Sequence, residues 1–261
     1  MPATQEEHID TEATYGGTPH HKRSLIGYLF LPLFLLAVLV ALFVAVSSSE
    51  LSSGEQRRLT LDSILTNAGQ HLMLSVVSTA FVLLIAIPLG ILLTRPFARS
   101  ITPPAIAVFN VGQAVPSIGL IALLAIIVGI GFWPVIGALV AYTVLPVLRN
   151  TMVGLRQVDA SVIESARGMG MTKRTVLARI ELPLAVPIIM AGLRTALTIN
   201  VGTATLGAFV GAGGLGELIV AGIVQNRQLI LVVGAVLVAV FALFIDYLAG
   251  LAEEVLRPRG L

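Results

Sequence analysis

The stretch that decides the fold is ESARGMGM, residues 164–171, which is followed after eight further residues by IELP, residues 180–183. This stretch is polar and cationic, yet long apolar segments lie on both sides of it, at 133–148 and 184–207. Charged side chains are costly inside a bilayer, so the stretch must lie outside the lipid. It is therefore a surface loop between two predicted membrane spans, and the rest of the chain can be read outward from it.

The composition is that of a membrane protein. Of the 261 residues 56% are hydrophobic and 11% are charged, and the mean hydropathy is +0.96. A soluble domain of this length could not bury so much apolar surface.

Windows of about 20 apolar residues, the length that crosses a bilayer, occur at 25–46, 71–93, 105–129, 133–148, 184–207 and 229–251. We predict an all-α polytopic membrane protein with about six transmembrane helices. The fourth is short, and Pro134 and Pro146 favour a tilt or a kink in it.

The basic residues predict the orientation of these spans. Twelve of the 16 Lys and Arg residues fall on one side of the predicted membrane, and the loops of the opposite side hold only three. Because basic loops are retained in the cytoplasm, both termini are predicted to be cytoplasmic. The asymmetry explains the pI near 9.3, so we expect contact with membrane lipid and no nucleic-acid partner. The twelve are Lys22, Arg23, Arg95, Arg99, Arg149, Arg156, Arg167, Lys173, Arg174, Arg179, Arg257 and Arg259.

The loop itself has the pattern of two short helices. Asp159 or Ser161 can cap the first helix, and Ser161 with Glu164 matches the S-x-x-E capping box. Glycines at 168 and 170 should end it, and Thr172 can cap a second helix that runs toward residue 180. The exposed face would mix apolar, methionine and charged side chains, a mixture that suits a groove in a protein. The alternative is a solvated basic loop held on anionic lipid.

The spacing of this loop resembles the EAA motif in the permease subunits of bacterial ABC importers. The motif positions are Glu164, Ser165, Ala166, Arg167, Gly168, Gly170, Leu182 and Pro183, with Ser165 where alanine is usual. In that family the loop forms coupling helices that sit in a cleft of the ATPase subunit. The resemblance implies the same role for the loop at 156–183 and a type I (MetI-like) permease fold.

Further stretches resemble the osmoprotectant branch of these importers: VLPVLRNTMVG (144–154), ELPLAVPIIMAGLR (181–194) and INVGTATLGAFVGAGGLGEL (199–218). The resemblance implies import of glycine betaine, choline, carnitine or a related quaternary ammonium compound across the bacterial cytoplasmic membrane. It also implies three kinds of partner: two ATP-binding subunits, a second permease copy or a paralogue, and a separate extracytoplasmic binding protein. Import of an amino acid or another small zwitterion remains open, as does an ion-coupled secondary transporter.

The chain has no pattern of an enzyme. It lacks the G-x-x-x-x-G-K-[ST] phosphate loop, so we expect ATP and Mg to be bound by the partner ATPase, and no cofactor in this subunit. The string GAGGLG at 211–216 has no strand-turn-helix context and predicts a turn between the last two spans. No H-E-x-x-H motif or convincing Ser or Asp dyad supports an intramembrane hydrolase, and we predict no catalytic residue and no metal site.

Several polar residues fall within the predicted spans, where burying them is costly. Arg194 and Asp246 lie at similar depth, and we predict an ion pair between them that locks spans five and six together. Other polar side chains could line the transport path, although Thr and Ser in membrane helices often bond only to their own backbone. These are Gln113, Ser117, Asn200, Thr203 and Thr205, whereas His71 is expected at the membrane interface.

The predicted organisation has four parts: a disordered cytoplasmic tail at 1–23, a first transmembrane helix with its outer connection at 24–67, a permease core at 68–254, and a cytoplasmic tail at 255–261. A cleaved signal peptide is the competing interpretation of the first span. The apolar run there is longer than a signal core, and the segment before it is acidic, so an uncleaved helix is favoured.

Overall fold

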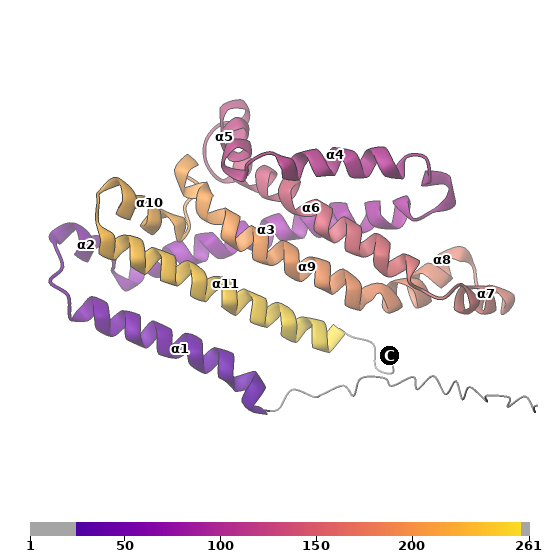
Figure 1. Ribbon diagram of the computed structural model, residues 1–261, viewed down its shortest axis with the longest axis horizontal. Coiled ribbons are helices and arrows are strands. Elements are labelled where there is room, and N and C mark those ends of the chain that lie inside the picture. Colours follow the sequence, from indigo (N-terminus) through magenta and orange to yellow (C-terminus); the bar gives the residue numbers. More distant parts are fainter. Residues whose placement is uncertain (1–24, 257–261) are drawn as a thin grey trace, which may run out of the picture.

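A computed structural model describes residues 25–256, and the two predicted cytoplasmic tails therefore lie largely outside the described residues. The part of the chain that is described is helical and contains no strand. Its helices form an elongated bundle in which most axes follow the long dimension (Figure 1). The expected all-α class is confirmed.

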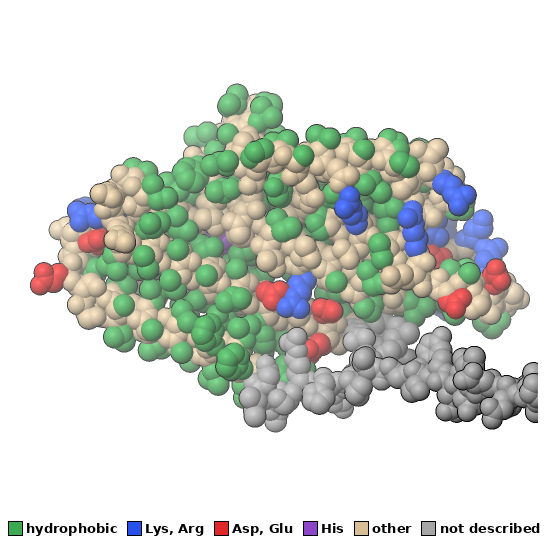
Figure 2. All heavy atoms as spheres, viewed as in Figure 1, with side chains coloured by type: hydrophobic (Ala, Val, Ile, Leu, Met, Phe, Trp, Pro, Cys, Tyr) green, Lys and Arg blue, Asp and Glu red, His purple; other side chains and the backbone are tan. Residues whose placement is uncertain are grey.

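Five helices are long and apolar enough to cross a membrane, and a bent pair brings the possible number of spans to six. The long ones are α1 (Leu25–Ser47), α3 (Leu61–Leu93), α6 (Phe132–Arg156), α9 (Leu182–Ala204) and α11 (Gln228–Leu256). Apolar side chains cover much of the visible surface of the bundle, as lipid-facing helices require (Figure 2). The predicted number of spans agrees with this arrangement.

The third predicted span is not one helix. It is broken into α4 (Thr102–Ala114) and α5 (Ser117–Val128), whose axes are bent by 96°. Pro116 lies at the break, and Val115 before it is extended, with φ −74° and ψ 133°. A residue that precedes proline is disfavoured in the helical region, so the helix ends there. In Figure 1, α5 projects from the side of the bundle.

The prediction of a short fourth span was wrong. Helix α6 has 25 residues and continues eight residues beyond the predicted end. Pro134 lies in its first turn, where the missing N–H is not needed. Pro146 lies inside the helix without ending it. The boundary predicted at residues 67 and 68 likewise falls inside a helix, α3, because α3 begins at Leu61.

The core forms where α6 packs against α3 and α9. One cluster of buried side chains lies toward the α7 end of these helices and includes Val82, Val147 and Leu148. A second cluster lies toward their opposite end and includes Leu74 and Leu139. Both clusters are built mainly of aliphatic side chains, which fill the space between helices without leaving polar groups unpaired.

Short elements close the two ends of the bundle. At one end lie α2 (Ser53–Arg58), the 3-10 turn η3 (Thr205–Val210) and α10 (Gly216–Val224), which packs on η3 and α11. At the other end lie η1 (Pro96–Ala98), α7 (Ala160–Gly168), α8 (Lys173–Val176) and the π-helical turn η2 (Leu177–Glu181). The expected glycine-rich turn is present, with positive φ at Gly211, Gly213 and Gly214.

Helix α1 lies at the edge of the bundle beside α11 (Figure 1). Two hydrogen bonds hold its described beginning: Tyr28 Oη donates to Glu254 Oε2 at 2.6 Å, and Tyr247 Oη donates to the Tyr28 carbonyl at 3.0 Å. Most side chains of α1 are apolar and exposed. This exposure is what a helix surrounded by lipid on most of its circumference would show.

Candidate functional site: the loop between α6 and α9

The first helix of the loop, α7, begins at its predicted aspartate cap. Asp159 Oδ1 accepts the backbone N–H of Ser161 at 2.8 Å. This hydrogen bond stabilises the charged carboxylate and holds the pKa of Asp159 below its ordinary value. The capping box predicted for Ser161 and Glu164 was wrong, because Ser161 already lies inside the helix and is not the cap.

A tight turn then reverses the chain. The N–H of Gly170 donates to the Arg167 carbonyl at 3.0 Å, and the N–H of Met171 donates to the Ala166 carbonyl at 3.2 Å. Gly170 has φ +88°, a conformation that side chains with a Cβ rarely adopt. Thr172 Oγ1 accepts the N–H of Thr175 at 3.2 Å and so caps α8 as predicted.

The motif residues of α7 lie mostly on an exposed surface. Glu164, Ser165 and Arg167 are exposed, whereas Ala166 is only 1% exposed and packs inward. Met169, which follows α7, is 77% exposed. An exposed methionine beside charged side chains is typical of adaptable protein contacts. The loop therefore presents a mixed surface that a partner could cover.

The second part of the loop is continuous with a membrane helix. Residues of α8, η2, α9 and η3 form one helical segment, Lys173–Val210, with a π-helical turn near its start. Leu182 and Pro183 begin α9 directly after the π-helical turn η2, and Pro183 has no N–H to donate to the preceding turn. A displacement of α8 would therefore be transmitted directly into α9.

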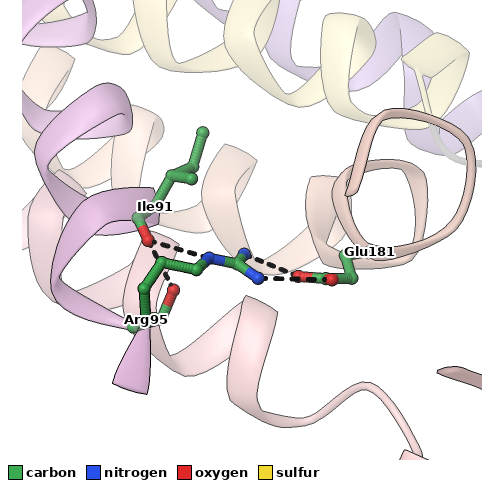
Figure 3. Close-up of polar contacts among 4 residues, drawn as sticks. Ile91, Arg95 and Glu181 are labelled. Atoms are coloured by element: carbon green, nitrogen blue, oxygen red, sulfur yellow. Dashed lines mark hydrogen bonds and ion pairs between the residues drawn. The ribbon is translucent and has the colours of Figure 1, made fainter. Parts of the chain in front are cut away.

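Glu181 of η2 is held by Arg95, which follows the end of α3 (Figure 3). Arg95 donates through Nη2 to Glu181 Oε2 at 2.6 Å and through Nη1 to Oε1 at 3.3 Å. Arg95 Nε also donates to the Ile91 carbonyl at 3.2 Å, which fixes the guanidinium direction. Sequence reasoning placed Arg95 only in a basic loop. Glu181, the one acid in the stretch IELP at 180–183, was the signal that a basic partner lay nearby.

A buried polar cluster joins the three core helices. Asn200 on α9 donates through Nδ2 to Thr79 Oγ1 on α3 at 2.9 Å. Thr143 Oγ1 on α6 lies 3.1 Å from Asn200 Oδ1 and 2.7 Å from the carbonyl of Leu139. Asn200 is fully buried. It was predicted to line the path, but in this conformation it links helices, because no surface of its side chain is accessible.

Gln113 also makes a hydrogen bond between helices, and its place on the transport path stays a prediction. Its Nε2 donates to the carbonyl of Tyr142 at 2.8 Å. In an α-helix this carbonyl would accept from residue 146, but Pro146 has no N–H. Gln113 of α4 therefore satisfies a carbonyl that the proline of α6 leaves free. Such compensation is what allows proline inside a membrane helix.

The remaining predicted path residues are half-buried. Ser117 begins α5, and Thr203 and Thr205 lie where α9 passes into η3. The buried Oγ1 of Thr205 has no hydrogen-bond partner within residues 25–256. Their contribution to a transport path stays a prediction.

Arg194 of α9 and Asp246 of α11 form an ion pair. Arg194 Nε donates to Asp246 Oδ1 at 2.5 Å, and Nη2 donates to Oδ2 at 2.6 Å. Both side chains are partly exposed in the single chain. The two parallel hydrogen bonds fix the orientation of the planar groups, so the contact sets how α9 and α11 lie against each other.

His71, which was expected at the membrane interface, is buried among the helices of the bundle. It is fully buried, its Nε2 lies 3.0 Å from the carbonyl of Val201, and its ring meets Phe241 edge-on at 5.2 Å. The helix of α9 gives way to the 3-10 turn η3 at Thr205, and carbonyls near a helix end need partners of this kind. His71, on α3, thus supplies a hydrogen-bond partner for a carbonyl near the end of α9.

The chain matches the family model described as "Binding-protein-dependent transport system inner membrane component" over residues 86–258. The osmoprotectant import permease protein OsmY of Salmonella typhimurium is 46% identical over 72% of this chain and 80% of its own length. The glycine betaine/carnitine/choline transport system permease protein OpuCB of Bacillus subtilis is 38% identical over 76% and 90%.

Among solved structures, a chain of the MetNI methionine ABC transporter in an inward-facing conformation matches with a TM-score of 0.68. Its identity is 24%, and the match covers 80% of this chain and all of that chain. At this identity the likeness concerns the fold, which is the one expected from the EAA-like loop. The helices, the loop and the sequence similarity agree: this chain belongs to the family of binding-protein-dependent transport system inner membrane components.

Proposed function

We propose that this chain is the transmembrane permease subunit of an ATP-driven importer for glycine betaine, choline, carnitine or a related quaternary ammonium osmoprotectant. The observation that carries the proposal is the exposed helix α7 with Glu164, Ser165 and Arg167, which the turn at Gly170 joins to the helical segment that contains α8 and α9. Relatives at 38 to 46% identity are named for the import of such solutes. The chain itself would not be an enzyme.

The loop would transmit a movement of the ATPase subunit to the membrane helices. An ATPase subunit that covers α7 and moves on nucleotide binding would push on α8, which is helical into α9. The ion pair between Arg95 and Glu181 connects the same point to the end of α3. Because α3 and α9 both pack on α6, a push at the loop would reach the core as a rigid-body movement.

Two ATP-binding subunits would complete the transporter and would bind ATP and Mg, for which this chain has no phosphate loop. A second permease copy or a paralogue would cover apolar surface that a single chain leaves open. Helices α4 and α5 expose Val108, Val111 and Ile126, the last at 82%. A separate binding protein would deliver the solute from outside.

The loop is proposed to lie in the cytoplasm, where ATP is available, in a cell whose inner membrane the chain crosses several times. Basic side chains gather at the α7 and α8 end of the bundle, as the preference of basic loops for the cytoplasm requires (Figure 2). Both termini would then be cytoplasmic.

Selection of the solute would rest mainly on the binding protein. Quaternary ammonium groups are recognised by cages of aromatic rings, and the polar residues proposed to line the path here are Ser117, Thr203 and Thr205. A permease of this kind would need only weak contacts with a delivered solute. An amino acid or another small zwitterion is the alternative cargo.

The experiment is purification of the tagged chain with its copurifying subunits, followed by ATPase assays in liposomes. We expect stoichiometric ATP-binding subunits and stimulation by binding protein loaded with glycine betaine. Glu164→Arg should abolish the stimulation and leave membrane insertion normal. Unaltered transport by this variant would refute the coupling role, and transport without ATP or any partner would favour a secondary carrier.

A further inference from the structure

A groove of about 740 Å³ lies between the end of α3 and the loop helices α7, α8 and η2. Its lining has two kinds of side chain. Apolar groups come from the membrane helix α3, from η1 and from the loop, and basic groups come from the loop and from Arg95. The lining residues are Pro88, Ile91, Leu92, Arg95, Pro96, Phe97, Ile163, Arg167, Lys173, Arg174, Val176, Leu177 and Glu181.

The charge of the groove is unbalanced. Four basic side chains face one acidic side chain, Glu181, and the carboxylate of Glu181 is already occupied by Arg95. No salt bridge within residues 25–256 involves the other three, Arg167, Lys173 and Arg174. The groove therefore presents about three uncompensated positive charges to whatever fills it.

The position of two of these cations increases the imbalance. Lys173 and Arg174 occupy the first turn of the long helical segment Lys173–Val210. A helix N-terminus carries a partial positive charge and favours acidic side chains, so basic residues there are electrostatically unfavourable. An anion bound between them would relieve both the mutual repulsion and the repulsion from the helix end.

The apolar floor of the groove is continuous with the lipid-facing surface of the bundle. Leu92 on α3 is 46% exposed, and Phe97 on η1 is 70% exposed. About two turns earlier on α3, Ile85 and Leu84 are also exposed. An ATPase subunit approaching from the aqueous side would meet α7, whereas Leu92 belongs to a helix that is long and apolar enough to cross the membrane. The occupant must therefore carry an anionic group and an apolar chain.

We propose that this groove binds one anionic phospholipid of the inner leaflet. Its phosphate would lie among Arg167, Lys173 and Arg174, and its acyl chains would cover Leu92 and Phe97. The lipid would brace the coupling loop against α3 beside the ion pair of Arg95 with Glu181. The inference rests on the cytoplasmic placement of the loop in the proposed function and is independent of which solute is carried.

The test is native mass spectrometry of the full chain, alone and assembled with its ATP-binding subunits, after exchange into nanodiscs that contain phosphatidylglycerol and phosphatidylcholine. We expect one phosphatidylglycerol molecule to be retained per chain in both samples. Each basic residue near an anionic headgroup contributes about 1 kcal/mol, so Arg174→Gln should weaken retention about fivefold. Lys173→Gln/Arg174→Gln should weaken it about 25-fold.

Arg179→Gln is the matched control, because Arg179 is an exposed cation in the same loop that does not line the groove. It should change retention by less than about twofold. Three results would overturn the proposal: an equal loss in Arg179→Gln, no preference for phosphatidylglycerol over phosphatidylcholine, or displacement of the lipid when the ATP-binding subunits assemble. The last would assign the groove to a protein contact. Lipid retention is measured without ATP, so a failed importer assay would not affect it.

Inorganic phosphate distinguishes a lipid from a simple anion. If the apolar floor contributes to binding, millimolar phosphate should leave phosphatidylglycerol in place, and Phe97→Ser should weaken retention severalfold. Complete displacement by phosphate, with no effect of Phe97→Ser, would show an anion site without an acyl chain and would contradict the lipid assignment.

Discussion

Arg95 and Glu181 lie 86 positions apart in the sequence, yet their side chains meet through two hydrogen bonds of 2.6 and 3.3 Å. Arg95 follows the membrane helix α3, and Glu181 ends the π-helical turn that leads into α9. The pair therefore ties the loop between α6 and α9 to a second membrane helix. Glu181 is buried, so loss of its partner would leave an uncompensated carboxylate in a poorly hydrated position.

Replacing either partner of this pair should weaken both stability and coupling. We expect Arg95→Gln or Glu181→Gln to lower the free energy of unfolding by about 2 kcal/mol, since hydrogen bonds between charged groups are worth about 1.5–3 kcal/mol. Chemical unfolding in detergent measures the first effect, and stimulated ATPase activity of the assembled transporter measures the second. Arg99→Gln, an exposed cation near Arg95, is the control. Equal losses in the control would contradict a specific role.

The ion pair between Arg194 and Asp246 should behave as a non-additive unit. Asp246→Asn leaves an unpaired guanidinium between α9 and α11, and we expect the melting temperature in detergent to fall by roughly 3–6 °C, the shift that about 1.5 kcal/mol produces in a chain of this size. Arg194→Gln/Asp246→Asn removes both charges and should lose less than the sum of the two single variants. Strict additivity would show that the pair contributes no coupling energy.

Substitution of Asn200 should lower the stability of the fold, because Asn200 joins three helices. Asn200→Ala removes partners from Thr79 and Thr143 and leaves a small void, so a loss of about 1–3 kcal/mol is expected. Thr198→Ala is the matched control on the same helix, because Thr198 Oγ1 bonds only to the Arg194 carbonyl of its own helix and is exposed. Similar melting temperatures for the two variants would argue against an interhelical role for Asn200.

The contact of Gln113 with the Tyr142 carbonyl can be tested through the proline that makes it necessary. Gln113→Met should cost about 1 kcal/mol, because it leaves that carbonyl unpaired. In a Pro146→Ala background, residue 146 regains an N–H for the same carbonyl, and Gln113→Met should cost less than half as much. The double-mutant cycle is measured by thermal unfolding. An equal loss of stability from Gln113→Met in both backgrounds would mean that the Gln113 amide does not compensate for Pro146.

The cap of α7 predicts how hydrogen exchange of this helix depends on pH. The pKa of Asp159 is lowered by the N–H of Ser161, so the folded loop binds the proton less well than the unfolded chain. The stabilisation by this carboxylate is present above the ordinary pKa and is lost only as the pH falls through the lowered value. Hydrogen exchange of α7, corrected for intrinsic rates, should therefore be constant from about pH 5 to 8.

Two substitutions separate the cap from its charge. Asp159→Asn keeps a side-chain acceptor for the N–H of Ser161 and should leave exchange of α7 nearly unchanged at neutral pH. Asp159→Ala removes the acceptor and should speed exchange about fivefold. Equal exchange in all three proteins would mean that a covering partner, and not the cap, holds α7.

Elements that depend on interactions between residues close in the sequence were predictable. The membrane spans follow from apolar length, because about 20 residues without charge have no other stable place. The loop helices follow from Asp159, Thr172 and the glycine that ends α7, since caps and positive φ act within a few residues. The break at Pro116 follows from the same kind of local rule, because the residue before a proline is disfavoured in a helix.

Roles that depend on a partner far away in the sequence could mostly not be predicted. Gln113 and Asn200 looked like path residues because a polar side chain in a span is costly, and the sequence does not say which group compensates it. In one case the compensating group is a carbonyl freed by Pro146, and in the other it is a pair of threonines on two other helices. Arg194 and Asp246 were the exception, since two opposite charges at equal depth have few other partners.

The sequence by itself determined the class, the number of spans, the position of the loop between α6 and α9 and the likeness to importer permeases, because hydropathy, caps and motif spacing are properties of neighbouring residues. Only the tertiary structure decided that Glu181 pairs with Arg95 and that three loop cations line a groove beside α3. Packing brings together residues from helices far apart in the chain, and the energies of ion pairs and burial depend on those distances in space.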